Sequence, residues 1–262
     1  MNGIRRRTSL VTLAAGLALG LLAAGPVRAE LTAKANHDHI TVDFFYHGST
    51  VGVRGIADPD ADLIIKIASA DGREALKEKG KKAGVLWMNV GTLEFEHAPK
   101  LYEIHSTRPV PELLPAAEAD RYVLGYSALS RHVAIEPLDS EQEKARWFGE
   151  FVKFKEASNL YATSAGKITF SEKAGTREYY INTPWPYQAP PGDYLATVYA
   201  VKNGQVVETA ESKILVEQVG TVKSLASMAK NHGALYGLLS ILSALGAGFG
   251  VGLVFRKGGG AH

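Results

Sequence analysis

The 262-residue chain contains no cysteine. It therefore has no disulfide, no thiol redox centre, no cysteine-linked c-type haem and no cysteine for a lipoprotein anchor. The chain also lacks the local motifs of common enzyme classes: the nucleophile elbow, the phosphate-binding loop, the zinc-protease helix and the kinase signatures. These absences favour a protein that is not an enzyme and uses no cofactor, although an enzyme with an unfamiliar site stays open.

The N-terminus has the three parts of a secretory signal peptide. Arginines 5–7 form a positive region, residues 10–24 form an apolar region of 15 residues, and small residues end at Ala29, where we expect cleavage. An uncleaved anchor is the alternative, but the apolar region is short for a span. Without residues 1–29 the chain loses four arginines and no acid, which leaves 25 basic and 27 acidic residues and a formal net charge of −2. No basic footprint for nucleic acid remains.

Near the C-terminus, residues 233–255 form a run of 23 residues without a charge. A helix of this length crosses a hydrocarbon core of about 30 Å. Residues 221–232 are expected to link it to the body, and Arg256 and Lys257 follow it directly. Because basic residues favour the cytoplasmic side, we predict a single-pass protein of the bacterial inner membrane, with its body in the periplasm and residues 256–262 in the cytoplasm. A periplasmic body without disulfides is allowed, since that compartment permits them but does not require them.

Small residues recur along this predicted span at helical spacing. Gly246 and Gly250 form one pair four residues apart, and Gly248 and Gly252 form another on roughly the opposite side. Rows of small residues let helix backbones approach closely in lipid, so the pattern predicts packing against a membrane-protein partner or self-association. The predicted helix-packing residues are Ser240, Ala244, Gly246, Gly248, Gly250 and Gly252.

Residues 30–108 read mainly as β-strands. Ile40, Val42, Phe44 and Tyr46 alternate with polar residues, as on a half-buried strand. The charged stretch 71–82 is the exception, and we expect a helical turn or a solvated loop there. Further strands are expected at 51–56, 62–68, 84–89, 92–96 and 100–106.

The pattern turns helical over residues 109–166. Helices are expected at 118–129 and 140–161, the second opened by a capping box of Ser140 and Glu143. Strands return over 167–220, at 167–171, 176–183 and 212–217, and Asn203-Gly204 between apolar runs predicts a hairpin turn. The predicted fold is mainly β: an immunoglobulin-like β-sandwich interrupted by a helical insert, with one C-terminal transmembrane helix. Whether the strand segments share one core or form two stays open.

Two histidines near the mature N-terminus are weak candidates for metal binding. On a strand, His37 and His39 would point to the same side. Two histidines are too few for a tight zinc or copper site, so we predict an exposed polar strand start and no metal. His97 and His105 lie in strand-like runs and are expected to be structural.

Several blocks occur in an order that resembles a known family. They are "ITVDFFYHGSTVGVRG", "GVLWMNVGTLEFEHAPKLYEIHSTRP", "NTPWPYQAPPGDYLATVYAVKNGQVV" and the glycine-rich tail ending "VFRK". Together they resemble the family of predicted transmembrane proteins described mainly from alphaproteobacteria. The resemblance implies a signal peptide, an exported β-rich body and one C-terminal span. It implies no activity; family members are often encoded near a permease resembling sulfite exporters, which hints at a transporter as partner.

These observations lead to one main functional hypothesis and one alternative. The main hypothesis is a membrane-anchored periplasmic accessory protein that docks on a polytopic partner, such as a transporter, through its glycine-rich helix. The alternative is a periplasmic module that binds a metal at His37 and His39, or a small anion, and serves a permease.

Overall fold

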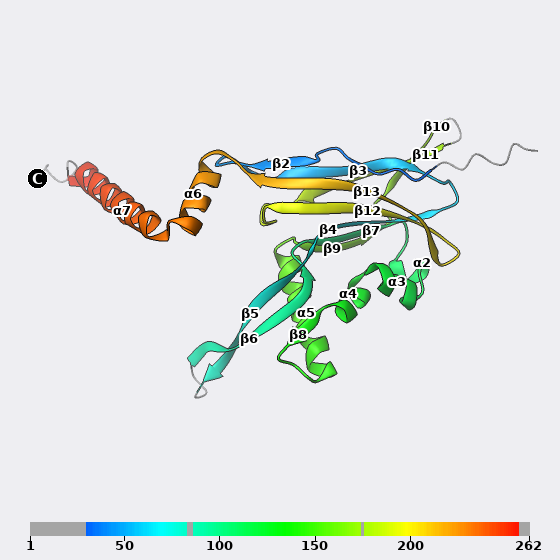
Figure 1. The fold of residues 1–262 in the computed structure, drawn as a ribbon, viewed down its shortest axis with the longest axis horizontal. Helices are drawn as coiled ribbons and strands as arrows, with labels where there is room; N and C mark the ends of the chain where they lie inside the picture. The colour runs from blue at the N-terminus through cyan, green and yellow to red at the C-terminus, as the bar shows by residue number, and fades with distance from the viewer. Residues whose placement is uncertain (1–29, 83–85, 174–175, 257–262) are drawn as a thin grey trace, which may run out of the picture.

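A computed structural model describes residues 30–82, 86–173 and 176–256. Two β-sheets form the centre of the molecule (Figure 1). The four-stranded sheet has the order β1 (Lys34–Ala35), β3 (Ser49–Ala57), β11 (Thr176–Trp185), β10 (Thr169–Lys173). The six-stranded sheet has the order β2 (His39–Val42), β13 (Gln205–Gln218), β12 (Gly192–Lys202), β4 (Asp62–Ser69), β7 (Tyr102–Ser106), β9 (Tyr161–Ala165).

Both faces of the six-stranded sheet are buried, as β4 illustrates. Leu63 and Ile65 belong to a core shared with the four-stranded sheet, whereas Ile64 belongs to a second core on the other face. Alternate residues of a strand point to opposite faces, so one apolar strand serves both cores. The core between the two sheets draws on strands from both the first and the last part of the body, so these two segments share it.

A helical layer covers the outer face of the six-stranded sheet (Figure 1). The stacked rings of Phe95 and Phe151 lie in the second core, between the helical layer and this sheet, with their centroids 4.3 Å apart. A three-stranded sheet of order β5–β6–β8 adjoins this layer. The bounds of these elements are α2 (Val110–Leu113), α3 (Ala116–Tyr122), α4 (Tyr126–His132), α5 (Glu141–Ala157), β5 (Asp71–Lys82), β6 (Leu86–Pro99) and β8 (Ala134–Glu136).

Four local predictions were wrong. Residues 71–82 form strand β5 and no helical turn or loop, because they pair with β6 along their whole length, and the two strands predicted at 84–89 and 92–96 are the single strand β6. The helix predicted over 118–129 is two helices, interrupted where Val123 takes a left-handed conformation with φ 51°. Ser140 does precede α5, but its side chain makes no capping hydrogen bond with any residue that the structure describes.

Other predictions are confirmed. The protein is mainly β, and Asn203 and Gly204 connect β12 to β13 with φ values of 51° and 76°. Positive φ at both positions is the signature of the hairpin turn that Asn-Gly favours.

After β13 the chain enters α6 (Gly220–Asn231) and α7 (Gly233–Arg256), which extend away from the sheets (Figure 1). The part of α7 from Gly233 to Leu253 is long and apolar enough to cross a membrane, and none of it is buried. The predicted signal peptide 1–29 and the tail after Arg256 lie outside the described residues.

Candidate functional site

The first candidate site is the surface of α7. Open space surrounds the position where a Cβ would stand on Gly246, Gly248, Gly250 and Gly252, since no atom lies within 4 Å beyond the helix's own backbone and chain neighbours. The hydroxyl of Ser240 donates to the carbonyl of Tyr236, 2.8 Å away, so this polar group is satisfied within the helix. The helix therefore presents its small residues on a surface that the described chain leaves uncovered, which suits a second helix in lipid.

The predicted metal candidates lie in different surroundings. His37 precedes β2 and lines a cleft, whereas His39 begins β2 and places its Nε2 3.5 Å from Oε2 of Glu217. Among the described residues, no group of three or more His, Cys, Asp or Glu side chains is placed to hold a metal ion. The structure therefore provides no metal-ligand set around this pair.

The cleft beside His37 is the second candidate site. It has a volume of about 790 Å³ and lies where the end of β11 and the start of β3 approach β7 and β9. Its polar lining includes His37, His47, Glu103, His105, Ser164, Lys167 and Thr183, and its aromatic lining includes Tyr161, Trp185 and Tyr187.

A buried polar cluster lies in the wall of this cleft. The ring of His105 places Nδ1 2.7 Å from Oγ of Ser164 and Nε2 3.3 Å from Oε2 of Glu103. The hydroxyl of Thr183, from the opposite sheet, donates to the same carboxylate oxygen at 3.0 Å. Glu103, His105 and Thr183 are buried. A hydroxyl, an imidazole and a carboxylate in series form a network that can hold and orient a proton.

Strand geometry explains how this cluster forms. Glu103 and His105 are two residues apart on β7, so they share a face, and parallel pairing places His105 opposite Ser164 on β9. We predicted a structural His105, and the sequence did not indicate the cluster around it. The available signal was the alternation of polar Glu103 and His105 with Tyr102 and Ile104 in this strand.

Trp185 adds a further polar group to the cleft wall. Its indole packs edge-on against Tyr194, with ring centroids 4.9 Å apart. The indole N–H is buried and has no hydrogen-bond partner within the part of the chain that the structure describes. A buried donor without a partner costs about 1–3 kcal/mol of folding stability, and most buried polar groups have one. The indole N–H is therefore available to donate to an acceptor on a bound molecule.

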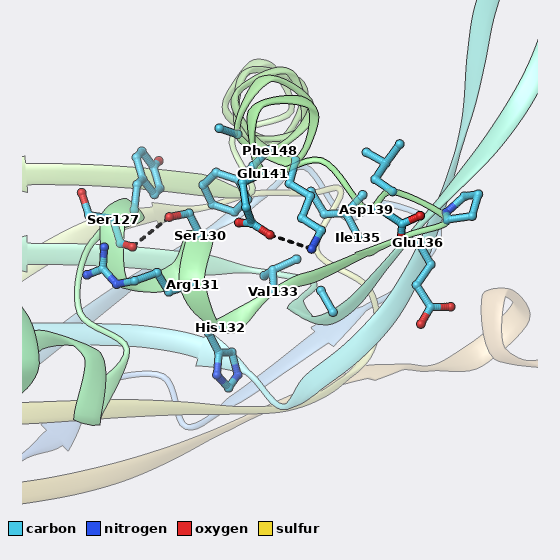
Figure 2. A pocket seen from close by; sticks show the side chains of 16 residues that line it. Ser127, Ser130, Arg131, His132, Val133, Ile135, Glu136, Asp139, Glu141 and Phe148 are labelled. Atoms are coloured by element: carbon cyan, nitrogen blue, oxygen red, sulfur yellow. Dashed lines mark hydrogen bonds and ion pairs between the residues drawn. The ribbon is translucent and has the colours of Figure 1, made fainter.

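A larger cavity of about 1040 Å³ lies between α4, the segment after it and α5 (Figure 2). Several of its charged side chains are engaged in local pairs. Arg131 Nε lies 2.9 Å from Asp120, His132 lies 2.6 Å from Asp71, and Lys144 pairs with Glu141 on the same helix. Arg131, His132 and Lys144 are thus paired separately and do not converge on one point of the cavity.

One comparison with known proteins gave a match. The sequence model of the family described as "Putative transmembrane protein (Alph_Pro_TM)" matches residues 30–257, which include the body, α6 and α7. No curated protein and no solved structure matches the chain.

Proposed function

Because the chain belongs to the Alph_Pro_TM family of transmembrane proteins, as its sequence resemblance indicated, we propose that it is a single-span accessory protein that docks on another membrane protein through α7. In this proposal the span lies in the bacterial inner membrane, with the body in the periplasm and the end of the chain in the cytoplasm. The signal-like residues 1–29 and the basic residues 256–257 support this orientation.

The observation that carries the proposal is the surface of α7. Two rows of small residues lie on a helix that has no covering partner among the described residues. Lipid chains are as apolar as leucine, so helices in a membrane associate through close packing at small residues. Two rows on two sides of one helix fit a partner that presents more than one helix, such as a transporter.

We further propose an immunoglobulin-like relationship for the body. The hydroxyl of Tyr194, near the start of β12, donates to the backbone carbonyl of Pro190, four residues upstream. Such a tyrosine corner is a hallmark of immunoglobulin-like sandwiches. Under this proposal residues 30–108 and 167–220 supply most strands of the sandwich and residues 109–166 are an insert, except that β9, at the end of the insert, joins the six-stranded sheet.

The test is co-purification of the full-length protein from its native membranes. A variant with Gly248→Leu and Gly252→Leu fills one row of small residues. The matched control, with Leu238→Phe and Leu242→Phe, adds bulk on the leucine-rich face between the rows. We expect the first variant to lose a stoichiometric polytopic partner that the wild type and the control retain. Retention of that partner by both variants would exclude docking through this row.

A second function is favoured by the cleft. The cluster of Glu103, His105 and Ser164, next to the unpartnered indole of Trp185, fits a module that binds a small polar ligand for a permease. Calorimetric titration of the full-length protein with copper, zinc and sulfite tests this function. We expect heat from at least one probe that disappears in His105→Gln, and no heat from any of them would count against these ligand classes.

A further inference from the structure

Three segments of the chain leave the two-sheet body at the same end. Tyr194 of β12 lies opposite Ser69 on one side and Ile214 on the other, so β4 and β13 end at the same edge. β2 runs parallel to β13, with Val42 opposite Gln218. The turn after β2, the β5–β6 hairpin and α6 therefore all leave the body at this end, and Figure 1 shows the hairpin and α6 leaving it in diverging directions.

The turn after β2 exposes two aromatic rings. Phe44 and Phe45 are 72% and 74% exposed, with their ring centroids 5.4 Å apart. The backbone N–H of Phe45 donates to the carboxylate of Asp43 at 2.9 Å, which braces the turn. The N–H of Val219 donates to the carbonyl of Val42 at 3.0 Å, so the turn is attached to the residue that precedes α6. Two exposed phenylalanines in one ordered turn form an apolar patch that calls for a covering surface.

α6 lies beside this turn and has two distinct faces. Val222, Leu225 and Ala229 recur at helical spacing on one face, and Lys223 and Lys230 lie on another. A short helix with an apolar face and a lysine face is typical of a segment that lies at the water–lipid interface. Its 12 residues span about 18 Å between the body and α7.

The β5–β6 hairpin is partly buried near the body and exposed in its outer half. Near the body, Phe95 is buried in the second core and Arg73 lies 3.3 Å from Glu94. Farther out, Leu86, Met88 and Val90 are exposed on β6. On the facing strand the exposed Lys77 and Lys79 make this outer half basic.

The reach of the hairpin matches that of α6. From Thr92 to Leu86 the strand extends about 20–24 Å beyond its buried part, close to the length of α6. Both elements start from the same end of the body, so the outer hairpin is long enough to contact a membrane that lies across this end.

We propose that this end of the body rests on the membrane that α7 crosses. The aromatic turn inserts Phe44 and Phe45 among the lipid headgroups. The outer half of the hairpin lies among anionic headgroups, with Leu86 and Met88 toward the acyl chains. Met88 is opposite Gly80 and Lys79 is opposite Asn89, so Lys77 and Lys79 lie on the other face of the hairpin and reach the lipid phosphates that surround it. The body is thereby held upright on its anchor by three contacts in place of a single flexible connection.

The absence of cysteine allows a direct test in the full-length protein. Phe45→Cys and Met88→Cys each carry one environment-sensitive fluorophore. Val207→Cys is the matched control, because Val207 is an exposed apolar residue near the opposite end of β13. The labelled proteins are reconstituted in vesicles of phosphatidylethanolamine and phosphatidylglycerol that contain nitroxide-labelled lipid. We expect lipid quenching at positions 45 and 88 and none at 207. Quenching at 45 and 88 no stronger than at 207 overturns the proposal.

A second comparison tests the role of the lysines. In the Met88→Cys protein, Lys77→Gln with Lys79→Gln is expected to reduce quenching at position 88 to the level found in pure phosphatidylcholine vesicles. Quenching that is unchanged by both the substitutions and the lipid composition would overturn the anionic-lipid contact. If labels 45 and 88 are shielded from an aqueous quencher but not reached by the lipid quencher, a protein surface covers this end and the membrane contact is wrong. These vesicles contain no partner protein, so failure of α7 docking would not affect the result.

Discussion

The buried ammonium group of Lys155 connects α5 to the root of the β5–β6 hairpin. The side chain is 2% exposed, and Nζ lies 2.5 Å from Oε1 of Glu74 and 3.3 Å from the carbonyl oxygen of Lys100. The rings of Phe151 and Tyr161 lie 5.4 and 5.5 Å from the ammonium group. Burial lowers the pKa of Lys155, and the neighbouring carboxylate of Glu74 offsets part of that shift.

Removing Glu74 and removing Lys155 should change the free energy of unfolding by different amounts. Glu74→Gln leaves a buried ammonium ion with one carbonyl and two ring faces, which costs about 3 kcal/mol of the free energy of unfolding. Lys155→Met removes the buried charge itself and leaves a carboxylate that is 21% exposed and can bind water, so its cost stays within about 1 kcal/mol. For a body of this size, 3 kcal/mol corresponds to a fall of roughly 6–12 °C in Tm.

The pH dependence has a defined sign. Because the pKa of Lys155 is lowered on folding, the unfolded chain binds more protons between the folded pKa and the ordinary value of 10.5. This group therefore makes the protein more stable as the pH rises through that window. Loss of the Glu74 carboxylate lowers the pKa of Lys155 further. The stability that Glu74→Gln loses relative to the wild type should therefore become smaller in alkaline buffer.

Thermal unfolding of the full-length protein in detergent, followed by near-ultraviolet circular dichroism, measures these effects. The expected order of Tm at neutral pH is wild type and Lys155→Met together, with Glu74→Gln well below them. Equal losses for the two single variants would show that the ion pair itself is strongly stabilising and would refute the desolvation argument. No loss for Glu74→Gln would show that water reaches the ammonium group.

Three further predictions concern the body. Gly55→Ala should lower the free energy of unfolding by about 3 kcal/mol, because a Cβ would stand 1.8 Å from the carbonyl oxygen of Thr32. Gly149→Ala, in open space on α5, should raise it by about 1 kcal/mol. Chemical denaturation measures both changes. Tyr194→Phe should cost about 1 kcal/mol, seen as a lower Tm, by removing the hydrogen bond to a backbone carbonyl. Burial raises the pKa of Tyr194 and Tyr199 to about 12, so the stability they contribute is present below pH 10 and lost as the pH rises through 12; tyrosinate absorbance should appear together with unfolding.

The parts of the fold that could be predicted are those with a local signal. The Asn203-Gly204 turn has its own backbone preference, and α7 is apolar along its whole length. Strand β5 has no such signal, because its outer half is exposed and its alternation is not hydrophobic. Its conformation comes from pairing with β6, which the residues 71–82 do not encode by themselves.

The interruption between α3 and α4 could not be predicted from the local sequence either. Val123 carries a β-branched side chain and is an unusual residue for a left-handed position. The N–H of Leu124 donates to the carbonyl of Ala119 at 2.9 Å, which closes the end of α3, and Leu124 is buried in the second core. Tertiary burial therefore outweighs the local helical pattern.

The polar cluster in the cleft depends on long-range register. Ser164 is 59 residues from His105, and Thr183 is 80 residues from Glu103. Only the parallel pairing of β7 with β9 and the packing of the opposite sheet bring them together. No spacing within one segment could have indicated that meeting, whereas the rows of small residues on α7 follow from helix geometry alone.

Site-specific photo-crosslinking in living cells tests the proposed docking of α7 most directly. A photoreactive amino acid replaces Val251, an exposed residue on the side of the row that contains Gly248 and Gly252, so that the small residues themselves stay intact. The control position is 242, on the leucine-rich face of the full-length protein. We predict a crosslink from position 251 to a polytopic membrane protein and none from position 242. Crosslinks from position 251 only to lipid, or only to a second copy of this chain, would contradict the account of an accessory protein.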